Sequence, residues 1–437
     1  MSSYVQALDH DPDYQAALAT YDEVAQVRPQ ALAKLLPQVG VGGGVGRIEQ
    51  SVSGTFFVGL LDDTRLGKLA SGDGISSNRD EYFNRFGYGV GIQQALFHWN
   101  LFLGLSQADV KVAAAKVALL QAQNKLRLAV ADAYFGVLSA QSQAQVAAAE
   151  HDALQQLAGQ TADRFKAGLV SDAQNQQAAA AAQGAQAAVI AANAMVQVAK
   201  AQLTVVTGEP EGNLAPFNEN VQLPAPEPDD VDSWVRHATT QNLGVGLAKL
   251  QLRIAQYGVR MARAQRLPTL DASATREYDY ATGGITSGIG AGHNHALDQR
   301  IMLQLKMPIF SGGAILSAVR AAEAGVRRAQ AVEDAKLAHA QADARIEFLK
   351  AEAHRAQLSA LKQALVSSAA GEKAARIGYR VGTQTYVDVL TSVQQHYEVE
   401  SHIAQTRYEY LLATLKLKDA AGSLSADDLQ RINGWLQ

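Results

Sequence analysis

The sequence predicts a mainly α-helical protein with a smaller membrane β-part, written twice within one chain of 437 residues. Three observations predict this fold class. Related segments recur at a constant spacing, each half contains strands of alternating apolar residues, and each half contains a very long helical stretch without proline. Such helix lengths are typical of coiled coils and helical tubes and exceed what one compact domain needs.

The internal repeat is recognised by its spacing of 213 or 214 residues. This spacing separates the members of four pairs: Phe97 and Phe310, Phe135 and Phe348, Gly168 and Gly382, Gly208 and Gly422. A constant spacing over so much of the chain indicates a duplicated plan. We therefore expect a first structural repeat over 1–220 and a second over 221–437, related by an internal pseudo-twofold.

Each half is expected to begin with a helix that ends at a proline. The helices cover about 14–36 and 231–267, and Pro37 and Pro268 end them because proline lacks the N–H donor. The period of apolar residues then changes from 3.6 to 2, as in a strand with one greasy face. The expected strands cover about 38–60 and 82–98 in the first half, and 268–283 and 298–310 in the second.

Each half continues with a helical hairpin, expected over about 100–207 and about 313–421. The hairpins turn at Gly168 and Gly382, because glycine permits the left-handed backbone of a tight turn. The segments 209–230 and 422–437 are expected to form linker or equatorial segments beside the helices, the first being rich in proline, asparagine and acidic residues.

Composition excludes several classes of function. The chain is 48% hydrophobic but only 6% aromatic, with a net charge of −4, so no basic surface for nucleic acid is indicated. It has no cysteine, which excludes disulfides and thiolate metal sites. The N-terminal residues lack the pattern of a signal peptide, and we interpret the chain as a mature form from which the signal has been removed.

Four strands with a greasy face indicate an oligomer. Lipid offers no partner to backbone edges, so only a closed barrel is viable, and such barrels need about eight strands or more. Two chains would supply about 8 strands and three about 12. Eight strands fill their own interior, whereas roughly 12 leave a passage, so a conduit favours a trimer.

The order and spacing of six phrases resemble the TolC family of outer-membrane factors almost from end to end. The phrases are AKLLPQVGV (33–41), ADAYFGVL (131–138), RFKAGLV (164–170), RLPTLDAS (266–273), MPIFSGG (307–313) and GYRVGTQTYVDVL (378–390). The resemblance implies a homotrimer with a 12-strand barrel in the outer membrane of a Gram-negative bacterium, continuous with a long α-helical coiled-coil barrel in the periplasm. It implies passive export of drugs or proteins, with no cofactor.

The same resemblance implies the partners. These are outer-membrane lipid, a periplasmic adaptor of the membrane fusion type, and an inner-membrane RND or ABC transporter. The hairpin turns are where the adaptor would dock: Gly168, Leu169, Val170, Ser171, Val381, Gly382 and Thr383. The plainer alternative is that the glycines serve only the turn geometry.

Six residues align with the family's periplasmic gate and constriction: Tyr379, Gln384, Asp388, Thr391, Gln174 and Asp172. Tyr379 and Asp388 match the family's tyrosine and first ring aspartate. Gln384 replaces an arginine, Thr391 a second ring aspartate, and Gln174 an aspartate for which Asp172 is an imperfect substitute. We therefore expect a gate held by neutral hydrogen bonds, such as Tyr379 or Gln384 to Gln174, rather than by a salt bridge.

Two further expectations concern the pore and the membrane boundary. Threefold symmetry would gather three Asp388 carboxylates, which would attract cations and raise one another's pKa; otherwise Asp388 is a solvated helix residue. Aromatic residues flank the expected second strand and suit a membrane-interface belt or plain packing at a strand end: Tyr82, Phe83, His98 and Trp99.

An enzyme is not indicated, because the sequence lacks the G-x-S-x-G, H-E-x-x-H and Walker A patterns, and no catalytic residue is assigned. His293 and His295 could bind a metal weakly, but no third ligand is in view, so no metal site is assigned. The alternative function is a soluble periplasmic coiled-coil scaffold without a pore. It would explain the long helices but not four alternating strands at duplicated positions.

Overall fold

The computed structural model describes residues 2–56, 75–209, 214–218, 221, 223–282 and 293–436. The helices are α1 (Ser2–His10), α2 (Pro12–Ala25), α3 (Val27–Ala33), α4 (Trp99–Lys166), α5 (Asp172–Thr207), α6 (Val231–Gln241), α7 (Leu243–Ala264), α8 (Ala314–Val381), α9 (Tyr386–Ala420) and α10 (Ala426–Asn433). The strands are β1 (Gln38–Phe56), β2 (Ile75–Phe97), β3 (Thr269–Thr282) and β4 (His293–Lys306). The mainly helical fold class with four strands is thereby confirmed.

The chain forms two compact units, and each contains segments from both halves of the sequence. A helical unit comprises 1–26, 109–256 and 324–437, and a sheet unit comprises 27–108 and 257–323. The pairing of β2 with β3 joins strands of the two repeats in one sheet. The repeats are therefore duplicated in sequence but share each folded unit.

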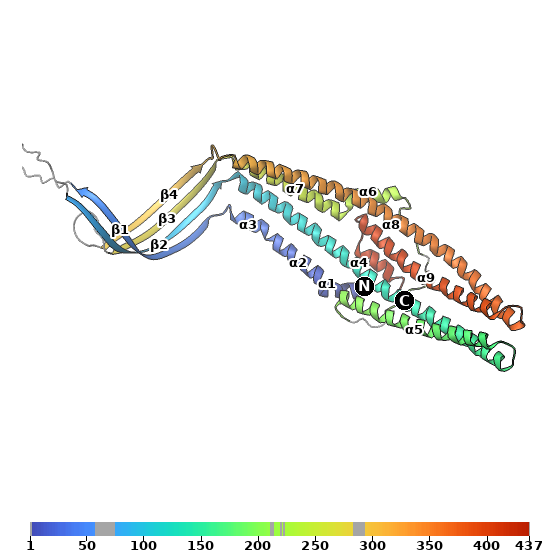
Figure 1. Ribbon diagram of the computed structural model, residues 1–437. Coiled ribbons are helices and arrows are strands. Elements are labelled where there is room, and N and C mark those ends of the chain that lie inside the picture. Colours follow the sequence, from blue (N-terminus) through green and yellow to red (C-terminus); the bar gives the residue numbers. More distant parts are fainter. Residues whose placement is uncertain are drawn as a thin grey trace, which may run out of the picture. The chain divides into compact units, whose positions relative to one another are not determined.

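The sheet unit is an antiparallel sheet with the order β1-β2-β3-β4 (Figure 1). Directly paired residues lie on the same face, so the register sorts the side chains into two faces. One face is mainly apolar and includes Val41, paired with Val90, and Ala274, paired with Ile301, although Arg276, paired with Val90 and Gln299, also lies on it. The other face carries most of the glycines of β1 and β2, together with most of the polar residues of β3 and β4. The alternation read from the sequence is therefore expressed as one greasy and one polar face.

Strand bounds differ from the expectation at three places, one of which is the start of β4 at His293 rather than near residue 298. β2 begins at Ile75 rather than near residue 82, because backbone ladder bonds with β1 do not need apolar side chains. β4 ends at Lys306 rather than near residue 310. Pro308 follows closely, and a proline cannot donate to the ladder.

Both opening helices are interrupted where single helices were expected. α2 ends at Ala25 and α3 starts at Val27. In a continuous helix the ring of Pro29 would clash with the carbonyl of Ala25, four residues earlier. α6 and α7 are separated by Asn242. Its side-chain oxygen accepts the N–H of Val245 (3.1 Å), and its amide donates to the carbonyl of Ala420 (2.9 Å), so it starts α7 and binds the end of α9.

The helical unit contains two hairpins, α4–α5 and α8–α9, which can be followed in Figure 1. α4 and α8 have 68 residues each, about 100 Å of helix. Their many small alanines allow close helix packing, and larger residues form separate core clusters. One such cluster joins Phe135 and Leu138 of α4 to Tyr408 and Leu411 of α9 and to Phe217 of the linker.

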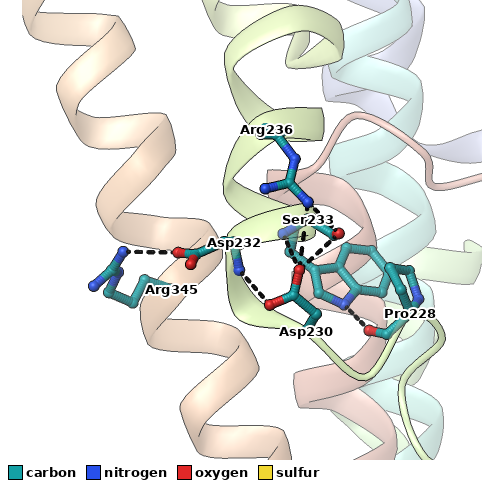
Figure 2. A network of polar contacts seen from close by, with 7 residues as sticks. Pro228, Asp230, Asp232, Ser233, Arg236 and Arg345 are labelled. Atoms are coloured by element: carbon teal, nitrogen blue, oxygen red, sulfur yellow. Dashed lines mark hydrogen bonds and ion pairs between the residues drawn. The ribbon is translucent and has the colours of Figure 1, made fainter.

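The segment after the linker is fixed to the helices by a polar network (Figure 2). The indole N–H of Trp234 donates to the carbonyl of Pro228 (2.7 Å), and Asp230 accepts the N–H groups of Asp232 and Ser233 at the start of α6. Asp232 in turn lies 3.5 Å from the guanidinium of Arg345 on α8. Because Trp234 is buried, this network and its packing hold the linker end against α8.

Among the described helices, α5 is long and apolar enough, by length and composition alone, to cross a membrane. Its apolar content is mostly alanine, interrupted by glutamine and asparagine. Alanine contributes little transfer energy, and the residues of α5 that are buried pack within the helical unit. We therefore assign α5 to the helical unit rather than to a membrane span.

The half-buried carboxyl of Asp419 makes stability depend on pH. Burial raises the pKa of Asp419 above its usual value, against the opposing effects of the Asn124 amide, which donates to it (3.1 Å), and of Arg127. A raised folded-state pKa means that the folded protein favours the protonated acid, so this group's contribution to stability is lost as pH rises through the folded pKa.

We expect Asp419→Asn to raise the denaturant midpoint of the helical unit at pH 7, because the amide removes the half-buried charge. The gain should shrink as the pH falls to about 4 and below, where the wild-type carboxyl is protonated. Circular dichroism during guanidinium unfolding at several pH values measures this. The exposed Asp427→Asn is the control; equal effects of both variants at all pH values would contradict the assignment.

Candidate functional site at the helical hairpin turns

The two hairpin turns have the same backbone geometry. Gly168 and Gly382 have φ angles of 71° and 87°, a left-handed conformation that side-chain-bearing residues rarely adopt. The N–H of Leu169 donates to the carbonyl of Arg164 (2.9 Å), and the N–H of Thr383 donates to that of Gly378 (2.8 Å). These bonds close the C-terminal ends of α4 and α8 as Schellman-type caps. A Cβ added to either glycine would meet no atom within 4 Å. Glycine is therefore required here by the positive φ angle and not by lack of space.

The returning helices α5 and α9 also begin in the same way, with a capping box. The hydroxyl of Ser171 accepts the N–H of Gln174, whose side-chain oxygen accepts the N–H of Ser171 (both 3.3 Å). Thr385 and Asp388 form the equivalent pair in α9, with the Thr385 N–H and hydroxyl donating to Asp388 Oδ2 at 2.8 and 2.7 Å. Gln174 and Asp388 are therefore duplicated positions, 214 residues apart, and both side chains serve a helix start.

The exposed carboxyl of Asp388 has a pKa below its usual value, because the side chain and backbone of Thr385 donate hydrogen bonds to its charged form. Mutual repulsion in a ring would act in the opposite direction. The single chain thus keeps Asp388 ionised at neutral pH, with the capping bonds opposing any rise in pKa that neighbouring carboxylates would cause.

A polar tie, by which we mean the contacts of Arg164 with Tyr379 and Arg380, joins the two hairpins at the ends of α4 and α8. Arg164, at the end of α4, donates to the carbonyl oxygens of Tyr379 (2.9 Å) and Arg380 (3.0 Å) at the end of α8. Its guanidinium also lies 4.4 Å from the centre of the Tyr379 ring. The Tyr379 hydroxyl is 3.4 Å from that of Thr161, which itself donates to the carbonyl of Leu157, so Tyr379 is the donor to Thr161.

An apolar cluster supports this tie. It contains Leu154 and Leu157 of α4, Tyr379 of α8 and Tyr386 and Val389 of α9, all almost completely buried. Alanines of α4, α5 and α8 complete it. The cluster and the bonds of Arg164 together hold the second hairpin against the first.

The other candidate gate residues do not join this network. Among the described residues, no hydrogen bond links Gln174 to Tyr379 or Gln384, since Gln174 is engaged by Ser171. Gln384 packs over the Cα of Gly378, where an added Cβ would lie 2.4 Å from its Cγ. Thr391 is exposed on α9, and Asp172 accepts only a long bond from Gln176 (3.4 Å).

The sequence does not single out Arg164 as a gate residue, because the arginine of the family's gate aligns with the second hairpin, where this chain has Gln384. The signal was nevertheless present in the phrase RFKAGLV, in which Arg164 directly precedes a turn. A cation in the last turn of a helix complements that helix's dipole, and here the guanidinium also reaches the last carbonyls of the neighbouring helix.

Large apolar side chains are exposed at the turns. Leu169 and Val381 are 73% and 68% exposed, and Phe165, Ile377 and Val387 are also exposed nearby. All seven expected docking residues lie in the two turns or directly beside them. Clusters of exposed apolar residues are characteristic of surfaces that contact another protein.

The expected membrane-interface residues lie in different surroundings. His98 Nε2 is 2.9 Å from Asp271 Oδ1, which lies on the polar face of the sheet. Trp99 is exposed and lies 6.3 Å from the Phe102 ring, as a belt residue would. The side chains of Tyr82 and Phe83 lie outside the described part, as do those of His293 and Asn294.

Aromatic residues do gather elsewhere on the apolar face of the sheet. Successive ring pairs connect Phe86, Tyr88, Tyr278, His295 and Tyr280 across three strands, at centroid distances of 5.9, 5.2, 6.2 and 4.9 Å. The hydroxyl of Tyr278 is within 2.8 Å of His295 Nδ1. Cross-strand register rather than sequence proximity assembles this row.

In the described part of the chain no group of three or more metal-ligating side chains occurs.

The chain belongs to the outer membrane efflux protein family, whose profile matches residues 3–209 and 234–423. It is 28% identical over 443 residues to outer membrane protein TolC of Escherichia coli K12, covering 100% of this chain and 84% of that protein. It is 25% identical over 435 residues to the alkaline protease secretion protein AprF of Pseudomonas aeruginosa, covering 99% and 86%.

Solved structures share the fold. The outer membrane protein VceC of Vibrio cholerae superposes with a TM-score of 0.76 at 19% identity, covering 96% of this chain and 95% of VceC. The open state of the Neisseria gonorrhoeae MtrE channel gives 0.72 at 16% identity, covering 97% and 89%. The chain is thus a non-enzymatic efflux or secretion channel of the outer membrane of Gram-negative bacteria that extends into the periplasm.

Arg164→Ala should loosen the end of α8, because two charge-assisted hydrogen bonds to its last carbonyls are lost. We expect amide hydrogen exchange in residues 375–384 to rise about tenfold or more. Lys166→Ala, which removes only an exposed contact with Asp163, is the matched control. Unchanged protection of α8 in Arg164→Ala would show that the apolar cluster alone holds the hairpins together.

Proposed function

We propose that three copies of the chain close a 12-strand barrel in the outer membrane, and that their helical hairpins form a duct with a gate at the turns. The observation that carries this proposal is the sheet itself. Its apolar face is open to the surroundings, with Val41, Ile301 and Leu303 each at least 69% exposed, and β1 and β4 are its two edges. Lipid on the apolar face and strands of further copies at both edges would satisfy these groups.

The spacing of aromatic residues fits a membrane span. Tyr88 in the aromatic row and Phe97 near Trp99 are nine residues apart on β2, about 30 Å along the strand. A tilt of about 40° reduces this to a height of about 23 Å, close to the ~25 Å apolar band of outer-membrane barrels. We therefore propose Trp99 and Phe102 for one interface belt and the aromatic row of Tyr88 for the other. His98 instead belongs to the polar face.

The turns are proposed to dock a periplasmic adaptor, which would connect the duct to an inner-membrane RND or ABC transporter. Exposed Leu169 and Val381 offer apolar contact, and Gly168, Val170, Ser171, Gly382 and Thr383 shape the turns. The names of the relatives include both efflux and protease secretion proteins, so the family supports either cargo. The soluble scaffold is not supported, because the family and the open apolar sheet both indicate a membrane protein.

The gate is proposed to depend on the tie between Arg164 and Tyr379, with Asp388 as the charged residue of the constriction. Each chain would contribute one Asp388 carboxylate around the threefold axis, and Thr391 would lie one helical turn further along α9. Gln174, Gln384 and Asp172 are close in sequence to the turns and remain candidates for contacts between copies.

Single-channel recording of detergent-purified protein in planar bilayers tests the proposal, together with native mass spectrometry of its oligomeric state. We expect a trimer and discrete openings, which Arg164→Ala should make larger or more frequent. A folded monomer that never conducts would contradict both the barrel and the gate.

Asp388→Asn should reduce cation selectivity, because the amide keeps an oxygen for the Thr385 cap but removes the charge. The reversal potential in a salt gradient measures the effect. Asp163→Asn, at an exposed acid on α4 near the same turn, is the control and should change selectivity much less. A reversal potential that Asp388→Asn leaves unchanged would exclude Asp388 from the constriction.

A further inference from the structure

The polar face of the sheet contains a trough floored by glycine. Alternate residues of β1 and β2 supply the floor: Gly40, Gly42, Gly44, Gly46, Gly87, Gly89 and Gly91. Its volume is about 530 Å³, and Arg85, Glu277 and Asp279 also line it. A run of glycines lowers the stability of a strand. Its concentration on one face of the sheet therefore needs a physical reason.

The glycines of β2 have such a reason within the chain. A Cβ on Gly87 would lie 2.5 Å from Asp279 Oδ1, and one on Gly89 would lie 2.8 Å from Glu277 Cγ. These are also the directly paired residues of β3. Long side chains of β3 therefore lie sideways across the glycines of the neighbouring strand, and Arg85 fixes Asp279 there through two hydrogen bonds of 2.9 and 2.7 Å.

The glycines of β1 have the same spacing but no such neighbour. A Cβ added to Gly40, Gly42, Gly44 or Gly46 would meet nothing within 4 Å. β1 is an edge of the sheet formed by the four described strands, so among these strands none lies on its far side to supply side chains. The floor is thus covered over β2 and open over β1.

We propose that the glycine strip of β1 receives the polar side chains of β4 from a second copy of this chain. β4 is the opposite edge and carries on its polar face a side chain larger than glycine at every second position, four of the five being polar: Asp298, Arg300, Met302, Gln304 and Lys306. These side chains would lie over the β1 glycines as Glu277 and Asp279 lie over those of β2. This inference rests on the proposed trimer, and it adds the side-chain contact through which β1 recognises β4 of the neighbouring copy.

Charge complementarity favours this occupant. Glu277 leans over β2 toward the trough, where its charge acts on the nearby Arg85. Arg85 itself makes its hydrogen bonds and ion pair with Asp279, and Glu277 forms no hydrogen bond with any residue in the described part of the chain. It is also paired across strands with Asp298, a like charge. Within the chain Arg300 forms an ion pair with Asp298 (2.8 Å). In the assembly, Arg300 of a second copy, arriving from the far side of β1, would bring this guanidinium toward Glu277 as well.

The test uses the full-length protein in detergent, with native mass spectrometry to count copies. Gly44→Leu fills the strip and should raise the ratio of monomer to trimer about tenfold or more, because overpacking weakens the contact between copies. Gly43→Leu makes the same change on the same strand but on the apolar face, where an added Cβ meets only ordinary contacts of 3.4 Å or more. It should leave the trimer intact.

Cross-linking tests the contact without a bulky residue, and the absence of native cysteine keeps the background clean. Gly44→Cys is combined in turn with cysteine at each of the five polar-face positions of β4. We expect one or two combinations to form disulfide-linked trimers on a non-reducing gel, and none when Gly43→Cys replaces Gly44→Cys.

The outcomes separate the two proposals. An intact trimer in which Gly44→Leu is harmless and Gly44→Cys never cross-links would overturn the glycine-strip inference and leave the barrel standing. A wild-type protein that forms no trimer would overturn both.

Discussion

The structure depends on the need of every backbone N–H and C=O group for a hydrogen-bond partner. Four strands form one antiparallel sheet with an apolar face, which leaves the outer edges of β1 and β4 open. In lipid such edges have no water to bind, so the sheet is viable only as part of a closed ring. In the function we propose, assembly of several chains is therefore a condition of membrane insertion rather than a later addition.

The same need determines the hairpin turns. Each long helix leaves its last carbonyls without intrahelical partners, and each returning helix leaves its first N–H groups likewise. Left-handed glycines and two capping boxes satisfy most of them within each hairpin. Arg164 reaches the last carbonyls of α8 from the other hairpin, so a requirement of helix ends becomes a connection between the two hairpins.

Duplication produced equal backbones with unequal chemistry. Gln174 and Asp388 occupy the same position in the two capping boxes, yet only Asp388 carries a charge. Arg164 has no counterpart tie from the second hairpin to the first among the described residues. Two similar hairpins can thus carry different charged groups, because both capping boxes keep the shared turn geometry.

By itself the sequence determined the fold class, the family and most element positions, because periodicity, proline and glycine act locally. It also placed the turns at Gly168 and Gly382. Only the tertiary structure decided the polar tie of Arg164, the pairing of His98 with Asp271 and the aromatic row from Phe86 to Tyr280. The first two contacts join residues 215 and 173 positions apart, and the aromatic row follows the register between strands. No local sequence pattern encodes which distant residues the packed helices and paired strands bring together.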